Sequence, residues 1–377
     1  MQSSLTNKKG TAAAIKRVSS SPSSLLYRHR TLAVSLAVML YLLFSSSLIL
    51  YDYNMNDDND KNMNNNDLIE EVSCPMIFQQ EKENTLNKNQ GSPPLQKYTK
   101  TSPPFWISIH NKRFDPRRFV IFVEGLYYEG GITDLFHKIL DKKVPGLVLD
   151  IGMNIGWFSL YSRAHGHDVA GFEPNPVMYL RICESMQLNH WMEDGSIKIF
   201  PYGLGNENET KDLVTGRNPG KSSFFAENIL QSAQKKERVE VRTLDDIARQ
   251  EGWLNADFNK SIYLMKVDVE GYERFVFEGG RRLLQSNRVK NIIMERTNSD
   301  HEANLHMLSS IYENGYRIHA IMDAYGNPYH SDPETIASAN EGLGKVPQYI
   351  QDGVEQEEVV RKFLTVAEMN IWFVLEE

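Results

Sequence analysis

The stretch from Leu147 to Glu173 constrains the fold more than any other part of the sequence. It begins with a short apolar run, as expected of a parallel strand that is covered on both faces. Gly152 and Gly156 then allow the chain to turn sharply and its backbone to approach a ligand closely. The sequence therefore predicts a strand at 147–151, a helix at 157–163 and a second strand at 167–172.

An acid stands at the end of each of these two predicted strands. Glu173 follows Asp150 by 23 positions. This is close to the separation of about 20 residues at which an acid at the second strand's end binds ribose hydroxyls. Open α/β sheets bind ligands beyond the carboxyl ends of their strands, where both acids are expected to lie. The unit therefore predicts nucleoside binding.

Four segments, in order, resemble one enzyme family. Asp150-Ile-Gly-Met-Asn-Ile-Gly156 is similar to the first motif of class I S-adenosylmethionine-dependent methyltransferases. More narrowly, it resembles the FkbM family of O-methyltransferases, which has Asn where many relatives carry the middle glycine. Leu264 to Glu273 is similar to the most distinctive stretch of that family. Together with 243–247 and 293–295, these segments extend the resemblance over roughly residues 145–300.

The resemblance implies a fold and a cofactor. The fold is a Rossmann-like α/β sheet of seven strands with the last one antiparallel, and alternating strands and helices after residue 105 predict a doubly wound sheet independently. The cofactor is S-adenosyl-L-methionine. The resemblance implies that it contacts Asp150, Gly152, Asn154, Gly156 and Glu173. Alternative roles remain, since Asp150 also suits a turn cap and Glu173 a surface acid.

Three further acids are candidates for catalysis. Asp268 and Glu270 follow a predicted strand, and Glu295 ends the next one. Methyl transfer to a hydroxyl needs a group that takes the hydroxyl proton, and a carboxylate within about 3 Å can do this. Asp268 and Glu270 would share a face on a straight strand. Glu295 would orient the acceptor or help to hold a hard cation. Alternatively, Asp268 caps the following helix and Glu270 favours its dipole.

Composition limits the partners. The formal net charge is −8, although residues 1–30 carry six basic and no acidic residues, so the remainder carries −14. An acidic body argues against nucleic acid, because phosphate binding needs a basic face. No histidine cluster with ligand spacing and no Cys-x-x-Cys occurs, so no metal site is expected. Cys74 and Cys183 are the two cysteines, and a bond between them is not expected. The oligomeric state is not indicated.

The N-terminal part predicts membrane attachment. Residues 31–50 are uncharged and, at 1.5 Å per residue, span about 30 Å, the thickness of a bilayer's hydrocarbon core. Basic residues precede this segment and acids follow it, which predicts a cytosolic N-terminus. A cleaved signal peptide is the alternative. The expected domains are a basic cytosolic tail (1–30), a transmembrane signal anchor (31–51), a disordered Asn/Asp/Pro-rich stem (52–104) and the FkbM-like domain (105–377).

This topology predicts a single-pass type II membrane protein of the Golgi or endoplasmic reticulum with a luminal catalytic domain. A glycan hydroxyl is then the first expected acceptor, and a small-molecule hydroxyl the second. A glycosyltransferase that uses a nucleotide sugar shares the topology and is one alternative. A nicotinamide oxidoreductase lacks support because the Gly-x-Gly-x-x-Gly spacing is absent. A non-catalytic protein that keeps the fold is the remaining alternative.

Overall fold

A computed structural model describes most of the chain from residue 71 onward. The described residues are 71, 73–79, 94–110, 128–141, 143–216, 220–225, 235–297, 300–323, 326–328, 331–352 and 368–376. The predicted cytosolic tail and the transmembrane segment at 31–51 lie outside these residues. So do residues 119–123, whose apolar run predicts a strand.

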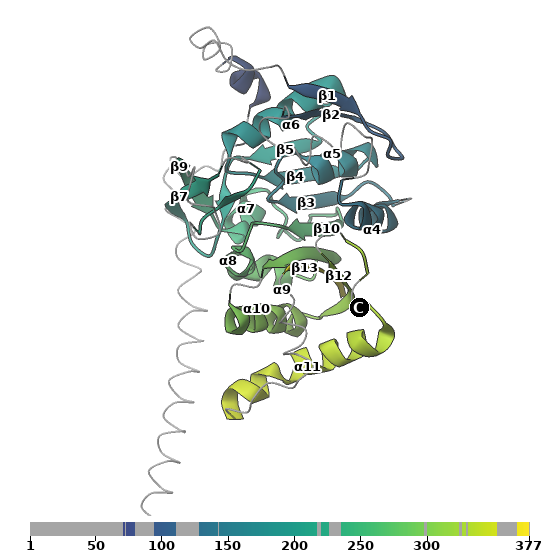
Figure 1. Ribbon diagram of the computed structural model, residues 1–377, viewed down its shortest axis with the longest axis vertical. Helices are drawn as coiled ribbons and strands as arrows, with labels where there is room; N and C mark the ends of the chain where they lie inside the picture. The colour runs from purple at the N-terminus through teal and green to yellow at the C-terminus, as the bar shows by residue number, and fades with distance from the viewer. Residues whose placement is uncertain are drawn as a thin grey trace, which may run out of the picture. The chain divides into compact units, whose positions relative to one another are not determined.

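A seven-stranded sheet forms the centre of the described domain (Figure 1). Its strands are β3 (Leu147–Ile151), β4 (Asp168–Phe172), β5 (Ile197–Phe200), β10 (Ile262–Val267), β11 (Asn291–Thr297), β12 (Tyr316–Asp323) and β13 (Glu368–Leu375). They are ordered β12-β13-β11-β10-β3-β4-β5. β13 runs antiparallel to both of its neighbours, whereas the ladders between β11 and β5 are parallel. The expected Rossmann-like sheet with an antiparallel last strand is confirmed.

Helices cover both faces of this sheet, which makes three layers. The helices are α4 (Gly130–Leu140), α5 (Trp157–Ala164), α6 (Pro176–Leu188), α7 (Leu244–Gln250), α8 (Glu273–Gly279), α9 (Arg281–Gln285), α10 (His301–Glu313) and α11 (Pro333–Asp352). Buried side chains of α4, α5 and α6 belong to one apolar core, and those of α7 to α11 belong to the other.

The central strand β3 shows why the sheet is buried on both sides. Leu147, Leu149 and Ile151 pack in the core beneath α7 to α11, whereas Val148 packs in the core beneath α4 to α6. Successive side chains of a strand point to opposite faces, so an apolar run without polar alternation requires two covered faces. Asp150 therefore lies on the side of Val148, facing α5.

A second sheet occupies the region after β5. Its strands are β6 (Gly203–Leu204), β7 (Glu209–Thr215), β8 (Ser222–Ser223) and β9 (Lys235–Arg242), in the order β6-β9-β7-β8. Residues 205–240 are polar and irregular in sequence, which predicts surface loops and at most a hairpin. The β7–β9 ladder is that hairpin, and it is extended by two strands of two residues each. Strands this short have too few side chains to show a period of two.

The predicted membrane topology is corrected by the structure. Over the part of the chain that the structure describes, no helix combines the length and the apolar composition needed to cross a bilayer. The prediction of a single-pass type II membrane protein of the Golgi or endoplasmic reticulum is contradicted by this finding.

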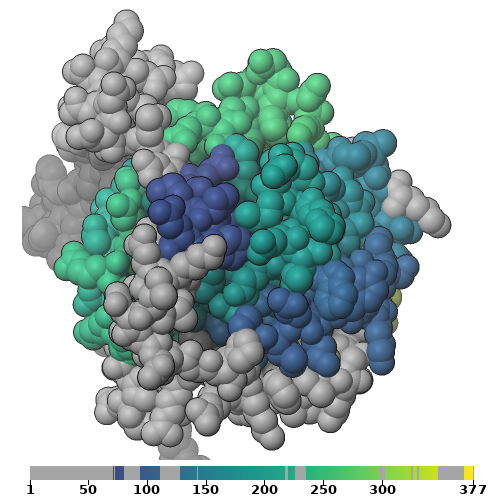
Figure 2. Space-filling view, turned by 90° about the horizontal axis from the view of Figure 1, so that it is seen from above, coloured from purple at the N-terminus to yellow at the C-terminus, as the bar shows by residue number. Residues whose placement is uncertain are grey.

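A disulfide joins Cys74 to Cys183, contrary to the sequence-based expectation. Cys183 lies on the buried face of α6, and the helical residues 74–79 pack in the same core, so the Cα atoms of Cys74 and Cys183 lie 5.3 Å apart. Figure 2 shows this short segment, in purple, against the teal surface of the domain.

Ordered structure therefore begins before residue 105, within the segment predicted to be a disordered stem. β1 (Leu95–Tyr98) pairs with β2 (Trp106–Ile109), and β2 is held on α6. The backbone N–H of Ser108 donates to Ser185 Oγ at 2.8 Å. The disulfide and this sheet attach the chain before residue 110 to the same helix.

We predict that removing the disulfide destabilises the domain. The bond closes a loop with a sequence separation of 109. Loop-closure entropy for this length corresponds to about 4.7 kcal/mol, and measured losses fall at about 2–5 kcal/mol. Cys183→Ala should lower the free energy of unfolding in urea by such an amount.

The double variant Cys74→Ala/Cys183→Ala serves as the control for this experiment. It should be little less stable than Cys183→Ala alone, because both lack the same bond. Reductant should destabilise the wild type and leave the double variant unchanged. Equal stability of the wild type and Cys183→Ala without reductant would show that the bond contributes nothing.

Candidate active site

The turn after β3 depends on its two glycines. Gly152 has a φ of 79°, and a Cβ built there would lie 1.8 Å from the carbonyl oxygen of Asp268. Gly156 has a φ of 83°, and its Cβ would lie 2.7 Å from the side chain of Ile182. A side chain at either position would combine an unfavourable backbone conformation with a steric clash. The motif therefore has glycine at the two positions where the turn leaves no room for a side chain.

Glu173 fixes the shape of this turn. Its Oε2 accepts a hydrogen bond from the backbone N–H of Asn154 at 3.0 Å, and its Oε1 accepts one from the N–H of Asn175 at 2.9 Å. Asn154 itself has a φ of 55°, which Asn tolerates better than most residues. The carboxylate therefore connects the end of β4 to the glycine turn. The alternative of a surface acid is wrong, because Glu173 is buried.

The same carboxylate has an unusual proton affinity. Burial raises the pKa of Glu173 to about 7, while the hydrogen bonds from Asn175 and Asn154 oppose that shift and the charge of Asp150 adds to it. Each carboxylate oxygen has two lone pairs, and one backbone N–H occupies one of them. Glu173 thus keeps acceptor capacity for a hydroxyl donor, and its charge changes near neutral pH.

Asp150 lies beneath the turn and is fully buried. Its Oδ2 accepts a hydrogen bond from Ser159 Oγ on α5 at 2.6 Å. Its Oδ1 is buried without a hydrogen-bond partner among the described residues. Burial raises the pKa of Asp150, although the nearby charge of Lys266 acts in the opposite direction. An unpartnered buried oxygen is costly, so its presence marks a place where a ligand would supply a donor.

Lys266 supplies the positive charge of the site. It pairs in register with Asp150 across the β10–β3 ladder, and its Nζ donates to Asp268 Oδ2 at 2.7 Å. Burial alone would lower the pKa of Lys266, but the charges of Asp268, Glu129 and Asp150 raise it above its usual range. The ammonium group therefore stays charged and balances several acids.

Asp268, which directly follows β10, and Glu295, on the neighbouring strand β11, form a carboxyl pair. The charge of Asp268 raises the pKa of Glu295 well above its ordinary value, and burial and a hydrogen bond between the two side chains add to this. Two carboxylates this close do not both ionise, so they share a proton. Since Asp268 also accepts from Lys266, the protonated form is favoured on Glu295. The structure brings these two predicted residues together.

The expected helix cap at Asp268 is not formed. α8 begins at Glu273 after Tyr272, which provides no side-chain cap. Instead, Glu273 Oε1 accepts from the backbone N–H groups of Val269 and Gly271 at 3.2 and 3.1 Å. The side chain of Asp268 instead accepts a hydrogen bond from Lys266 and interacts with Glu295.

Glu270 does not share a strand face with Asp268, contrary to the expectation. β10 ends at Val267, and Glu270 has a left-handed φ of 53°. The backbone turns there, so the period-two rule for strands does not apply. Its carboxylate is still near enough to raise the pKa of Glu295.

Two residues that contact the site or its charges could not be predicted from the sequence motifs. Glu129 precedes α4 with a φ of 44°, and its charge reaches Lys266 from a segment outside every motif. Ser159 lies on α5, nine positions after the aspartate it contacts. Lys266, in contrast, stands two positions before Asp268, a spacing that places both side chains on one face where a strand ends.

Comparisons with known proteins identify relatives. A model of the methyltransferase FkbM domain matches residues 150–318. Methyltransferase sdnD of Sordaria araneosa is 30% identical over 176 residues, which cover 40% of this chain and 67% of that protein. Methyltransferase 1 of Beauveria bassiana is 29% identical over 149 residues, which cover 35% of this chain and 57% of that protein.

The crystal structure of an FkbM methyltransferase from Methylobacillus flagellatus aligns with a TM-score of 0.30 and 13% identity. The alignment covers 61% of this chain and 43% of that one.

We predict that Lys266→Met destabilises the domain strongly. Removing one partner of a buried ion pair leaves the other uncompensated, which costs on the order of 3 kcal/mol. Here Asp150, Asp268 and Glu129 would all lose their counter-charge. Urea unfolding at pH 8, where the acids are most ionised, should show the largest loss, and the loss should shrink as the pH is lowered.

Lys198→Met is the matched control. Lys198 pairs with Glu251 at 2.9 Å and with Glu71 at 2.7 Å, but its side chain is 39% exposed. Exposed pairs of this kind contribute less than about 1 kcal/mol. Equal destabilisation by the two variants would contradict the role given to Lys266.

Proposed function

The chain belongs to the FkbM family of S-adenosylmethionine-dependent methyltransferases, and we propose that it methylates a hydroxyl oxygen of a small-molecule acceptor. Family membership argues against the glycosyltransferase and oxidoreductase alternatives, and the methyltransferase relatives support catalysis over a non-catalytic role. The more specific proposal, that the methyl group is transferred to oxygen, rests on the chemistry of Asp268 after β10 and Glu295 on β11.

We assign cofactor binding to the turn after β3. Gly152, Asn154 and Gly156 would present backbone to the amino-acid part of S-adenosylmethionine, and Glu173 would accept from the ribose hydroxyls. Two observations fit such a ligand. Both glycine positions exclude a side chain where the backbone must stay open, and Asp150 Oδ1 is a buried acceptor with no partner among the described residues. Bound there, the cofactor supplies an electrophilic methyl group.

We assign the proton transfer to Asp268. A hydroxyl oxygen is a weak nucleophile until its proton is removed, and a positioned carboxylate contributes about 10²–10⁴-fold through general base catalysis. Lys266 holds Asp268 in place and in its charged form. Glu295, whose pKa is raised by Asp268, would donate a hydrogen bond in its protonated form and so orient the acceptor. Glu270 would contribute negative charge at the rim of the site.

One contact carries this proposal. The backbone of Gly152 packs directly on that of Asp268, and the N–H of Asp268 donates to the carbonyl of Ile151 at 3.0 Å. The turn assigned to the cofactor and the residue assigned as the base are therefore adjacent. Proximity of this kind is what a displacement between two bound molecules requires.

The acceptor is proposed as a small molecule rather than a glycan. The argument for a glycan depended on the predicted luminal topology, for which no helix among the described residues gives support. A small acceptor needs only a hydroxyl that can reach Asp268 and Glu295. The relatives in Sordaria and Beauveria are named only as methyltransferases and do not narrow the acceptor further.

Calorimetric titration of the full chain tests the cofactor assignment. S-adenosylhomocysteine should bind without manganese, whereas UDP and NAD should not bind. Glu173→Ala and Asp150→Ala should each weaken binding, because each removes an acceptor for the ligand. Asp268→Ala should bind S-adenosylhomocysteine like the wild type but lower methyl transfer by about 10²–10⁴-fold.

Methyl transfer would be measured with radiolabelled S-adenosylmethionine and a panel of hydroxyl compounds. Asp212→Ala is the control, since this acid is exposed on β7 and pairs only loosely with Lys236, at 3.9 Å. Asp212→Ala should change neither the affinity for S-adenosylhomocysteine nor the rate of methyl transfer. An equal loss of cofactor affinity in Asp150→Ala, Glu173→Ala and Asp268→Ala would refute the division of roles.

The raised pKa of Glu173 predicts a pH-dependent cofactor affinity. Below its pKa of about 7 the carboxyl group is neutral, and one oxygen carries a proton instead of accepting from ribose. Binding then requires loss of that proton. The dissociation constant of S-adenosylhomocysteine should therefore rise as the pH falls from 7 to 6, by up to about tenfold for one proton.

Glu173→Gln is the control for this titration, because an amide does not ionise. Its affinity should be weaker than that of the wild type and nearly constant between pH 6 and 8. A wild-type affinity that stays constant over the same range would contradict the assignment of Glu173 to the ribose.

A further inference from the structure

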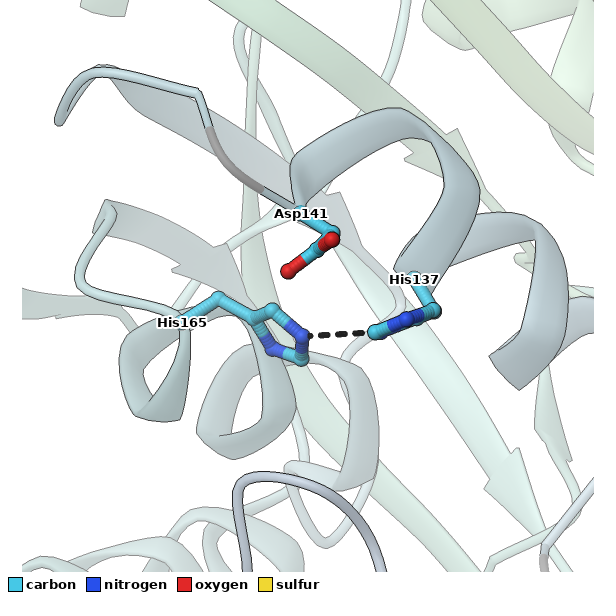
Figure 3. Close-up of side chains that lie close together, drawn as sticks. All are labelled: His137, Asp141 and His165. Carbon is cyan, nitrogen blue, oxygen red and sulfur yellow. Dashed lines mark hydrogen bonds between the residues drawn. The ribbon is translucent and has the colours of Figure 1, made fainter.

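A cluster of two histidines and an aspartate lies outside the candidate active site. His137 lies in the last turn of α4, Asp141 directly follows that helix, and His165 directly follows α5 (Figure 3). One donor atom from each of the three residues lies within 4.8 Å of the other two. His137 Nδ1 and His165 Nε2 are 3.2 Å apart.

The backbone holds these residues in place before any ligand binds. Asp141 is the C-cap residue of α4, four positions after His137, so the two residues lie one helical turn apart. The N–H of Asp141 donates to the carbonyl of His137 at 2.8 Å, so the helix end is regular there. α4 and α5 are packed together by Phe136 and Phe158, whose ring centroids lie 4.5 Å apart. The spacing between the two helix ends is thus set by the core.

The protonation of His165 also suits a ligand role. Its Nδ1 lies 3.0 Å from the carbonyl oxygen of Tyr161, which can only accept a hydrogen bond. Nδ1 therefore carries the proton, and the Nε2 lone pair points toward His137. Metal-bound histidines typically donate their other ring N–H to a carbonyl in this way, which fixes the tautomer and the ring orientation.

We propose that His137, Asp141 and His165 bind a divalent transition-metal ion of the zinc class. Metal–nitrogen bonds of 2.0–2.1 Å at tetrahedral angles separate two nitrogens by about 3.3 Å, close to the separation of the two imidazoles here. Two imidazoles and one carboxylate are the donors that such ions prefer over Ca²⁺ or Mg²⁺. Water completes the coordination, because His137 is exposed.

The position of this site assigns it a structural role. α4 leads into the start of β3, and His165 precedes the start of β4, so the cluster lies at the amino ends of the strands. The candidate active site lies at the opposite, carboxyl ends. The ion would clip the end of α4 to the end of α5. At the other end of the same helix pair, Trp157 Nε1 donates to Thr133 Oγ1 at 2.9 Å, next to the glycine turn.

Zinc binding to the untagged full chain tests this proposal. After dialysis against a chelator, calorimetric titration with Zn²⁺ should show one site per chain, and Zn²⁺ should raise the melting temperature. His165→Ala should weaken binding by more than about 100-fold, since even loss of an outer hydrogen bond to a ligand costs about 10–100-fold. Asp141→Asn, which keeps the side-chain size, should weaken it by at least about tenfold and abolish most of the thermal shift.

His306→Ala is the matched control, because His306 is an exposed histidine on α10. It should bind Zn²⁺ and respond thermally like the wild type. The proposal would be overturned by the absence of a site at one equivalent, or by unchanged zinc affinity in both His165→Ala and Asp141→Asn. Binding of S-adenosylhomocysteine should persist in the zinc-free protein, which separates this result from a failure of the cofactor assignment.

Discussion

The ammonium group of Lys266 is the interaction on which the rest of the site depends. It lies between acids from three segments of the chain: Asp150 on β3, Asp268 after β10 and Glu129 before α4. Carboxylates at such separations repel one another strongly in a poorly solvated place. A single buried cation allows them to converge.

The order of the strands explains why the glycine turn after β3 and Asp268 after β10 are adjacent. The parallel β3–β10 ladder brings the ends of both strands to one edge, and the small residue at Gly152 allows their following turns to touch. Glu173 then holds the glycine turn from β4, and Glu273 holds the turn after β10. Both carboxylates accept backbone N–H groups, so these turns are stabilised by the protein before a ligand is bound. Such preorganisation reduces the conformational entropy that is lost when a ligand binds.

Much of the fold follows from local sequence, because buried parallel strands are apolar and turns need glycine. The stretch from Leu147 to Glu173 therefore predicts its strands, its helix and the acids at its ends. Other features depend on contacts between distant segments. The pairing of Cys74 with Cys183 has no local pattern, and His137 and His165 meet only because α4 packs on α5. Glu270 shows a different limit, since the sequence does not reveal that the strand ends three residues earlier.

The bond between Cys74 and Cys183 makes a covalent ring of the chain between them. That ring contains β3, α5 and β4, and with them the glycine turn and Glu173. A single cut by a protease anywhere between residues 75 and 182 would leave both fragments joined through sulfur. The nicked chain would migrate as one species in a denaturing gel and separate into two after reduction.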